Sequence, residues 1–359
     1  MRNDPKAEES LGYFNLARGV GMILIVAGHS ANVFLPVSER VSSWGKAGSV
    51  LGGGLMAMFF MISGFGFYKR SPRKCFSIQK KMLLKPYFFV ASAVLGTRLF
   101  LAIVKQRSFW THGGELVLTY VLGLNAEGGG KLFTIPVESI SILWFLLALF
   151  IGWNLYNAIV QLSSGSMQKV LVMGCVILSY LLTQISKVWF YCLPMGLLAV
   201  GYLAAGDYIH KKGLLSKEIS IWCRGLLMVF SILQMMFGNI NIVACVWKLG
   251  LLDVAGTFCI GFLIMRLYAE VMRWKLKGRV VGFLEEIGLK SIWIVCLHAY
   301  EKIIFPWYRI RAVFTDHVLL GICLCFLARC AIMYVFYRII LVIRRKWRKQ
   351  RKTKILIQS

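Results

Sequence analysis

The sequence has few charged residues for its length. Only 16% of its 359 residues are charged and 58% are hydrophobic, whereas soluble domains contain about 25% charged and about 45–50% apolar residues. Acidic residues are the scarcest, since 15 Asp and Glu stand against 42 Lys and Arg. This composition argues against an ordinary soluble enzyme. An excess of positive charge would suggest nucleic acid in a soluble protein, but here the basic residues separate long apolar runs.

Motifs for disulfide frameworks and metal sites are also missing. None of the ten cysteines forms a C-x-x-C pair, and most lie inside apolar runs. The five histidines form neither an H-x-x-x-H nor an H-E-x-x-H pair. We therefore expect the cysteines to be small buried hydrophobic residues and expect no metal site.

Apolar runs of about 20 residues, long enough to cross a hydrocarbon core about 30 Å thick, recur along nearly the whole chain. The first run, Tyr13 to Leu35, is too long for a signal-peptide core and lacks an A-x-A site, so we expect it to remain as a span. The sequence predicts an all-α, polytopic membrane protein made of a single domain, residues 1–359. The ten candidate spans are 13–35, 50–68, 83–104, 139–161, 168–185, 188–208, 220–238, 242–268, 287–305 and 318–343.

Basic residues gather in every second connecting segment, which predicts that both termini are cytoplasmic. The basic tail at 344–359 would attract anionic lipid headgroups, which explains much of the net charge of +27 without nucleic acid. The longest outer segment, 105–138, is expected to be a re-entrant or capping loop. The inner basic segments are Arg2 to Lys6, Lys69 to Lys81, Lys169, Lys211 to Lys217, Arg273 to Arg279, and Arg344 to Lys354.

Ionisable residues inside apolar spans usually face a bundle interior or an aqueous cavity. Arg18 and His29 in the first span are eleven residues apart, which places them within about 20° on one helical face and about 16 Å apart along the axis. A cation near the cytoplasmic end and an imidazole deeper in the membrane suit a substrate with an anionic head and a reactive group. Alternatively, Arg18 reaches lipid phosphate and His29 bonds a neighbouring helix.

His298 lies in the ninth span at a depth close to that of His29, so the two histidines are candidates for one shared site. Asp253, Glu301 and Glu138 are predicted near this depth and are candidate catalytic or acceptor-binding partners, although separate helix-packing hydrogen bonds explain each acid equally well. Arg98 and Arg329 lie well inside spans three and ten. Each either holds an anionic substrate group or pairs with an acid or backbone carbonyls.

Four segments, in order, resemble the integral-membrane acyltransferase-3 family, and in particular its branch similar to fucose-4-O-acetylases and exopolysaccharide acyltransferases. Arg18, ten intervening residues and His29 reproduce the family's first-helix signature. The other matching segments are FFMISGFGFYKR at 59–70, ILWFLLALF at 142–150 and GLKSIWIVCLH at 288–298.

This resemblance implies transfer of an acyl group, commonly acetyl, from cytosolic acyl-CoA to a hydroxyl of a glycan or lipid-linked glycan in the bacterial cell envelope. It implies His29 as the catalytic base, acting directly or through an acyl intermediate, and Arg18 as a donor-binding or architectural residue. Acyl-CoA would be a co-substrate, so no tightly bound cofactor is expected.

The resemblance also implies a basic cluster that binds acyl-CoA on a cytoplasmic loop. Arg70 and Arg73 have the family's R-x-x-R spacing, but the cluster Lys80, Lys81 and Lys85 is an alternative. Asn15 and Leu143 depart from the pattern, since many relatives carry Asp and some carry His at these places. Ser63-Gly64 is interpreted mainly as permitting close helix packing. The rival functions are a transporter or flippase of an envelope polysaccharide intermediate and a non-catalytic scaffold.

Overall fold

The protein is an all-α polytopic membrane protein. The computed structural model describes residues 14–35, 43–106, 113–132, 134–274 and 277–358, and within them eight helical segments are long and apolar enough to cross a membrane. Such segments become helices because a helix satisfies every backbone polar group internally in lipid. The eight are α2 (Asn15–Phe34), α3 (Ser43–Phe65), the run from α4 (Pro72–Gln79) through a π-helical turn (Lys80–Leu84) to α5 (Lys85–Val104), α7 (Trp144–Leu162), α8 (Gly165–Ile185), α9 (Leu193–Lys212), α11 (Leu251–Arg273) and α15 (Val318–Gln358).

Two of the ten predicted spans correspond to shorter helices. The seventh is α10 (Ile221–Phe237), and the ninth is α13 (Ser291–Ile304). The ninth span was predicted at 287–305, but the helix is interrupted at Lys290, where φ is −98° and ψ is 11°. The residues before this break form α12 (Arg279–Leu289), so the predicted span divides into two helices.

The predicted start of the eighth span at residue 242 is wrong, because α11 begins at Leu251. The preceding residues form two short paired strands, β3 (Ile240–Asn241) and β4 (Val246–Trp247). The Asn241 side chain accepts hydrogen bonds from the backbone N–H groups of Val243 and Ala244. Because Cys245 and Gly250 adopt left-handed φ values of 54° and 60°, the backbone turns here and cannot continue a helix.

The outer segment predicted at 105–138 contains a short helix and a hairpin. Helix α6 (Gly114–Val121) contacts α5 and strand β2 (Ile135–Ser139), which pairs antiparallel with β1 (Asn125–Leu132). The Tyr87 hydroxyl on α5 donates to the Tyr120 carbonyl oxygen at 2.7 Å. The part of this segment at 107–112 lies outside the described residues.

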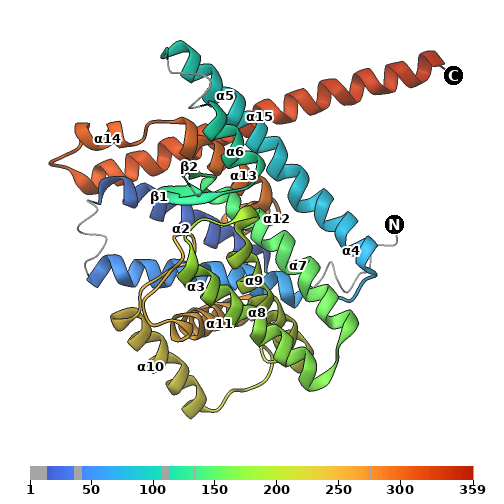
Figure 1. Ribbon diagram of the computed structural model, residues 1–359, viewed down its shortest axis with the longest axis vertical. Coiled ribbons are helices and arrows are strands. Elements are labelled where there is room, and N and C mark those ends of the chain that lie inside the picture. Colours follow the sequence, from blue (N-terminus) through green and yellow to red (C-terminus); the bar gives the residue numbers. More distant parts are fainter. Residues whose placement is uncertain (1–13, 36–42, 107–112, 133, 275–276, 359) are drawn as a thin grey trace.

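Two groups of helices make up the bundle (Figure 1). In one group, α9 packs against α3, α7 and α8, and α3 also packs against α11. In the other, α2 packs against α12 and α15, and α13 contacts α5, α2 and α15. Helix α15 extends beyond the rest of the bundle toward the C-terminus, on the side where α4 lies (Figure 1).

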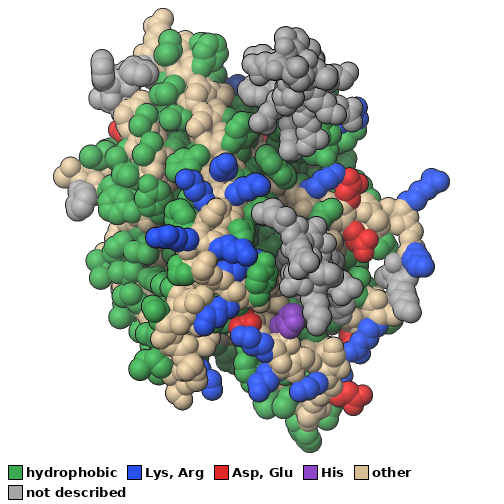
Figure 2. Space-filling model, turned by 90° about the vertical axis from the view of Figure 1, so that its right-hand side faces the viewer, with side chains coloured by type: hydrophobic (Ala, Val, Ile, Leu, Met, Phe, Trp, Pro, Cys, Tyr) green, Lys and Arg blue, Asp and Glu red, His purple; other side chains and the backbone are tan. Residues whose placement is uncertain are grey.

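The end of the bundle that carries α4 is strongly basic. Figure 2 shows this face, with lysine and arginine side chains spread over it and few acidic ones. Lys69, Arg73 and Lys74 are exposed beside the start of α4. The loop charges predict that this end faces the cytoplasm.

Glycines bring α3 and α9 into direct backbone contact. A Cβ on Gly64 would collide with the Leu203 carbonyl, and one on Gly206 would collide with the Met61 carbonyl. Small residues at such contacts allow membrane helices to approach closely. The predicted packing role of Ser63-Gly64 agrees with this geometry, and the Ser63 hydroxyl accepts a hydrogen bond from Trp153 Nε1 at 2.8 Å.

We expect Gly64→Ala and Gly206→Ala each to lower the free energy of unfolding by about 1–3 kcal/mol, because the added methyl group forces the two backbones apart. Thermal unfolding of the detergent-solubilised protein would measure this loss. Gly174→Ala on α8 is the matched control, since a Cβ there meets nothing within 4 Å. An unchanged melting midpoint in Gly206→Ala would contradict the close contact.

Candidate active site

Arg18 and His29 lie on α2, as the first-span pattern predicts. Arg18 is half-buried, and its Nη2 donates a hydrogen bond to Asn15 Oδ1 at 2.7 Å. His29 is partly exposed, and its ring centroid lies 5.3 Å from that of His298, with the ring planes inclined by 49°. The structure therefore brings together the two histidines that were predicted at one depth.

The packing of α2 on α12 explains why these histidines meet. A Cβ on Gly19 would collide with the Leu284 carbonyl, and a Cβ on Gly288 would collide with the Asn15 carbonyl. Because Gly19 lies against Leu284 and Gly288 lies against Asn15, the two helices run antiparallel at this contact. The chain then turns at Lys290, and α13 packs against α2 so that His298 lies beside His29.

A chain of buried polar groups extends from His298. His298 Nδ1 lies 2.5 Å from Glu301 Oε1, and Arg329 Nη1 on α15 donates to the same oxygen at 3.1 Å. All three residues are almost completely buried. Charged hydrogen bonds of this kind are stronger than neutral ones, and a buried charge without a partner would be costly.

Trp307 contacts two members of this group of buried polar residues, Glu301 and Arg329. Its Nε1 donates to the Glu301 backbone carbonyl at 3.2 Å, and the Arg329 guanidinium carbon lies 4.6 Å from its ring centroid. From the sequence alone, Arg329 was one of two arginines with no assigned role, and Trp307 was not placed in the site. The only local signal was the i,i+3 spacing of His298 and Glu301, because Arg329 and Trp307 come from other elements.

This arrangement has a defined chemical capacity. If the Glu301 carboxylate is ionised, it accepts a hydrogen bond from a protonated His298 Nδ1, which leaves His298 Nε2 as an acceptor. His298 Nε2 is buried and has no hydrogen-bond partner among the described residues. A carboxylate that orients an imidazole in this way is the arrangement that general base catalysis uses.

The other two candidate acids lie in different polar contacts. Asp253 is bonded by the Gln234 side-chain amide and by the Leu249 backbone N–H at 2.8 Å, so it links the start of α11 to α10. Glu138 forms a two-pronged ion pair with Arg98, in which Nη2 donates to Oε1 at 3.0 Å. The structure thus joins Glu301 to His298 and gives Asp253 and Glu138 packing partners.

On the basic end, Arg70 is held firmly against α7. Its backbone N–H donates to Asn157 Oδ1 at 3.0 Å, and its carbonyl accepts from Asn157 Nδ2 at 2.8 Å and from Gln161 Nε2. The Arg70 guanidinium stacks 3.7 Å from the Tyr68 ring centroid. The backbone is therefore fixed independently of the arginine side chain.

Arg73 lines a pocket of about 420 Å³ with Pro72, Phe76, Asn154 and Asn157. This pocket lies where α4 meets α7, directly beside Arg70. The alternative cluster differs, because Lys80, Lys81 and Lys85 are exposed on the π-helical turn and the start of α5. Arg73 thus lines this pocket, and Arg70 is bonded to Asn157 in its wall.

Comparison with known proteins gives one match. The family model for the acyltransferase-3 family, described as an acyltransferase domain, matches residues 11–345. No curated protein and no solved structure matches the chain. Because the matched range covers nearly the whole chain, including both histidines, the protein belongs to the acyltransferase-3 family and is a membrane acyltransferase.

Proposed function

We propose that this acyltransferase moves an acyl group, acetyl in the simplest case, from cytosolic acyl-CoA to a hydroxyl of a glycan or lipid-linked glycan in a bacterial cell envelope. The observation that carries the proposal is the pairing of a partly exposed His29 with the buried chain His298, Glu301 and Arg329 inside a helical bundle.

In the proposed reaction the His29 imidazole accepts the proton of the acceptor hydroxyl as the oxygen attacks the thioester carbonyl carbon. The carbon–sulfur bond breaks, and the imidazolium returns the proton to the departing thiolate, so the products are an ester and free CoA. His29 is assigned as the base because it is partly exposed, whereas His298 is fully buried. Glu301 holds the His298 ring through Nδ1, and the His298 ring, packed against that of His29, positions the base.

The donor enters from the basic end in this proposal. Arg70 and Arg73 bind the CoA phosphates beside the pocket between α4 and α7. A guanidinium group can donate two parallel hydrogen bonds to the oxygens of one phosphate. Arg18 lies between this end and His29 on α2, on the path that the thioester arm must follow. Lys80, Lys81 and Lys85 form the outer part of the same basic surface.

We expect His29→Ala to reduce CoA release from acetyl-CoA by about 10²- to 10⁴-fold, because a general base contributes this much to the rate. The assay uses membranes with equal amounts of each variant together with isolated envelope glycan, whose acylation is followed by mass spectrometry. His317→Ala is the matched control, since His317 is exposed between α14 (Tyr308–Val313) and α15. Full activity of His29→Ala would refute its role as base, and glycan movement without CoA release would indicate a transporter.

The buried group of His298, Glu301 and Arg329 predicts an effect on kcat. Glu301→Gln should lower kcat at least about tenfold while leaving the KM for acetyl-CoA unchanged, because the carboxylate positions an imidazole and does not touch the donor. The single variant leaves the Arg329 charge without its carboxylate, so Glu301→Gln combined with Arg329→Gln serves as a folding control. Restored membrane abundance in the double variant with activity still low supports positioning, and restored activity contradicts it.

Charge reversal should separate the two basic clusters. Arg70→Glu with Arg73→Glu is expected to raise the KM for acetyl-CoA more than about tenfold, because carboxylates would then repel the donor phosphates that the arginines bind. Lys80→Glu with Lys81→Glu should have a smaller effect, and exposed Lys169→Glu should have none. Unchanged donor affinity in both cluster variants would exclude this surface as the CoA site.

A further inference from the structure

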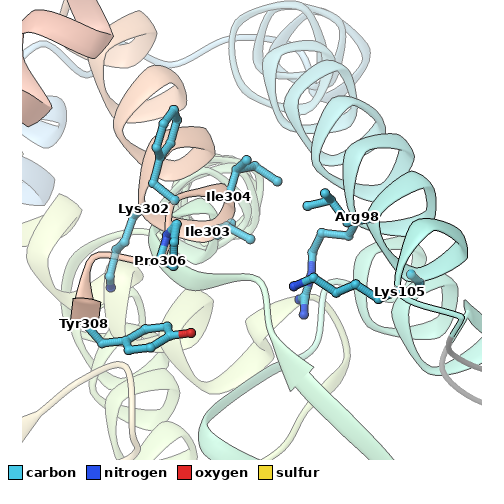
Figure 3. Close-up of a pocket in the computed structure, with 10 residues that line it drawn as sticks. Arg98, Lys105, Lys302, Ile303, Ile304, Pro306 and Tyr308 are labelled. Atoms are coloured by element: carbon cyan, nitrogen blue, oxygen red, sulfur yellow. The ribbon is translucent and has the colours of Figure 1, made fainter. Parts of the chain in front are cut away.

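A second pocket lies at the far end of the continuous helix that starts beside Arg70. It has a volume of about 400 Å³ and lies between the last turns of α5 and the end of α13 with the residues that follow (Figure 3). Ligand pockets typically measure about 300–1,000 Å³. Since α4 and α5 together form one membrane-length run, Pro72–Val104, this pocket is on the membrane face opposite the basic end.

Most of the wall of this pocket is apolar. Leu101 and Ala102 line it from α5, and Ile303, Phe305 and Pro306 line it from the end of α13 and the residues that follow. Sites for small molecules are typically walled in this way, with a few polar groups that orient the ligand. The pocket therefore suits a ligand that has apolar faces and polar edges.

Tyr308 supplies an aromatic surface in this pocket. It is 69% exposed, so a face of its ring is accessible to a ligand, and its hydroxyl points across the pocket toward the end of Arg98 (Figure 3). Tyrosine combines an apolar ring with a polar tip. A pyranose matches both features, because it has C–H groups on its faces and hydroxyl groups around its edge.

Arg98 lies on the other side of the pocket and is held in place by Glu138. Its Nη1 and Nη2 both bond the Glu138 carboxylate, and the two side chains are 23% and 35% exposed. A guanidinium has five N–H groups and a carboxylate has about four acceptor positions, so the pair has more of both than its own two bonds use. Since the pair is neutral overall, it orients hydroxyl groups without requiring a charged ligand.

The wall that carries Tyr308 is attached to the buried polar group of the candidate active site. Trp307, between Pro306 and Tyr308, is only 8% exposed. It donates to the Glu301 backbone carbonyl and lies against the Arg329 guanidinium. The contacts that hold Glu301 and Arg329 thus also fix the pocket wall, which lowers the cost of ordering it when a ligand binds.

The pocket lies close to the histidines along α13. Ile303 follows His298 by five residues, which is about 7.5 Å along the helix axis. Beneath the pocket, Thr97 on α5 and Tyr300 on α13 share a hydrogen bond of 3.0 Å that joins the two helices. A ligand in this pocket therefore lies at the outer end of the helix that carries His298.

We propose that this pocket binds the acceptor through one pyranose ring, which stacks on Tyr308 and directs its hydroxyl groups toward the Arg98–Glu138 pair. Tyr308 is then a specificity-determining residue, because it selects a ring with an apolar face. The inference rests on the proposed acyl transfer and assigns a binding site for its second substrate. It also places donor and acceptor on opposite faces of the membrane, with the two histidines between them.

The test is saturation-transfer difference NMR on the full chain in nanodiscs, which detects the ligand protons that contact the protein. The probes are oligosaccharides released from isolated envelope glycan and lipid-linked oligosaccharides extracted from the same envelopes. Tetraethylene glycol is the control probe without a ring, and empty nanodiscs give the background. We expect saturation of the C–H protons of a sugar ring, and the fraction with the stronger signal identifies the source of the acceptor. Sugar signals no stronger than that of tetraethylene glycol would overturn the proposal.

Tyr308→Ala should weaken binding of the glycan about threefold to tenfold, as expected for the loss of one aromatic contact, whereas Tyr308→Phe keeps the ring and should retain binding. Tyr208→Ala is the matched control, because Tyr208 is an exposed tyrosine on α9 that does not line the pocket. Unchanged binding in Tyr308→Ala would overturn the proposal. An equal loss in Tyr208→Ala would also overturn it, since the contact would then not be specific to this pocket.

Two further measurements separate this inference from the proposed reaction. Tyr308→Ala should raise the KM for the glycan and leave the KM for acetyl-CoA unchanged, and His29→Ala should retain the ring saturation. If no variant or wild-type protein releases CoA but saturation that depends on Tyr308 persists, the acyl transfer fails and the sugar site stands. If CoA is released and the saturation is absent, the acyl transfer stands and the pocket assignment fails.

Discussion

The backbone contact between α2 and α12 is the constraint on which the candidate site depends. Gly19 and Gly288 have no side chains, so each helix lies against a carbonyl of the other. A larger residue at either place would move the helices apart and change their register. The chain turns at Lys290 just after this contact, and α13 then packs against α2, which places the imidazoles of His298 and His29 side by side.

Burial then determines which polar groups cooperate. A charge in a low-dielectric interior needs a partner within hydrogen-bond distance, and the described part of the chain provides separate partners for each acid. Glu301 takes Arg329 and His298, Glu138 takes Arg98, and Asp253 takes Gln234. This distribution makes Glu301 the acid that acts on an imidazole, while the other two acids hold elements together.

Two pockets lie at opposite ends of the helical run Pro72–Val104. The pocket beside Arg70 lies at the start of the α4 and α5 run, and a second pocket, lined by Leu101 and Tyr308 among others, lies at its end. In the proposed reaction, the donor therefore approaches from the basic face, and the second pocket lies on the opposite face. The short helix α6 and the β1–β2 hairpin cover part of that opposite face, next to α5.

The sequence by itself determined the local features of this protein. Apolar length and helical period are properties of consecutive residues, so the membrane helices, the shared face of Arg18 and His29, and the i,i+3 pair of His298 and Glu301 were all predictable. The start of α11 and the break at Lys290 were not, because they depend on backbone turns within apolar runs. Only the tertiary structure decided that Arg329 and Trp307 join Glu301, and that Asp253 and Glu138 do not. These choices depend on how distant helices rotate and pack against each other, which no periodicity along the chain records.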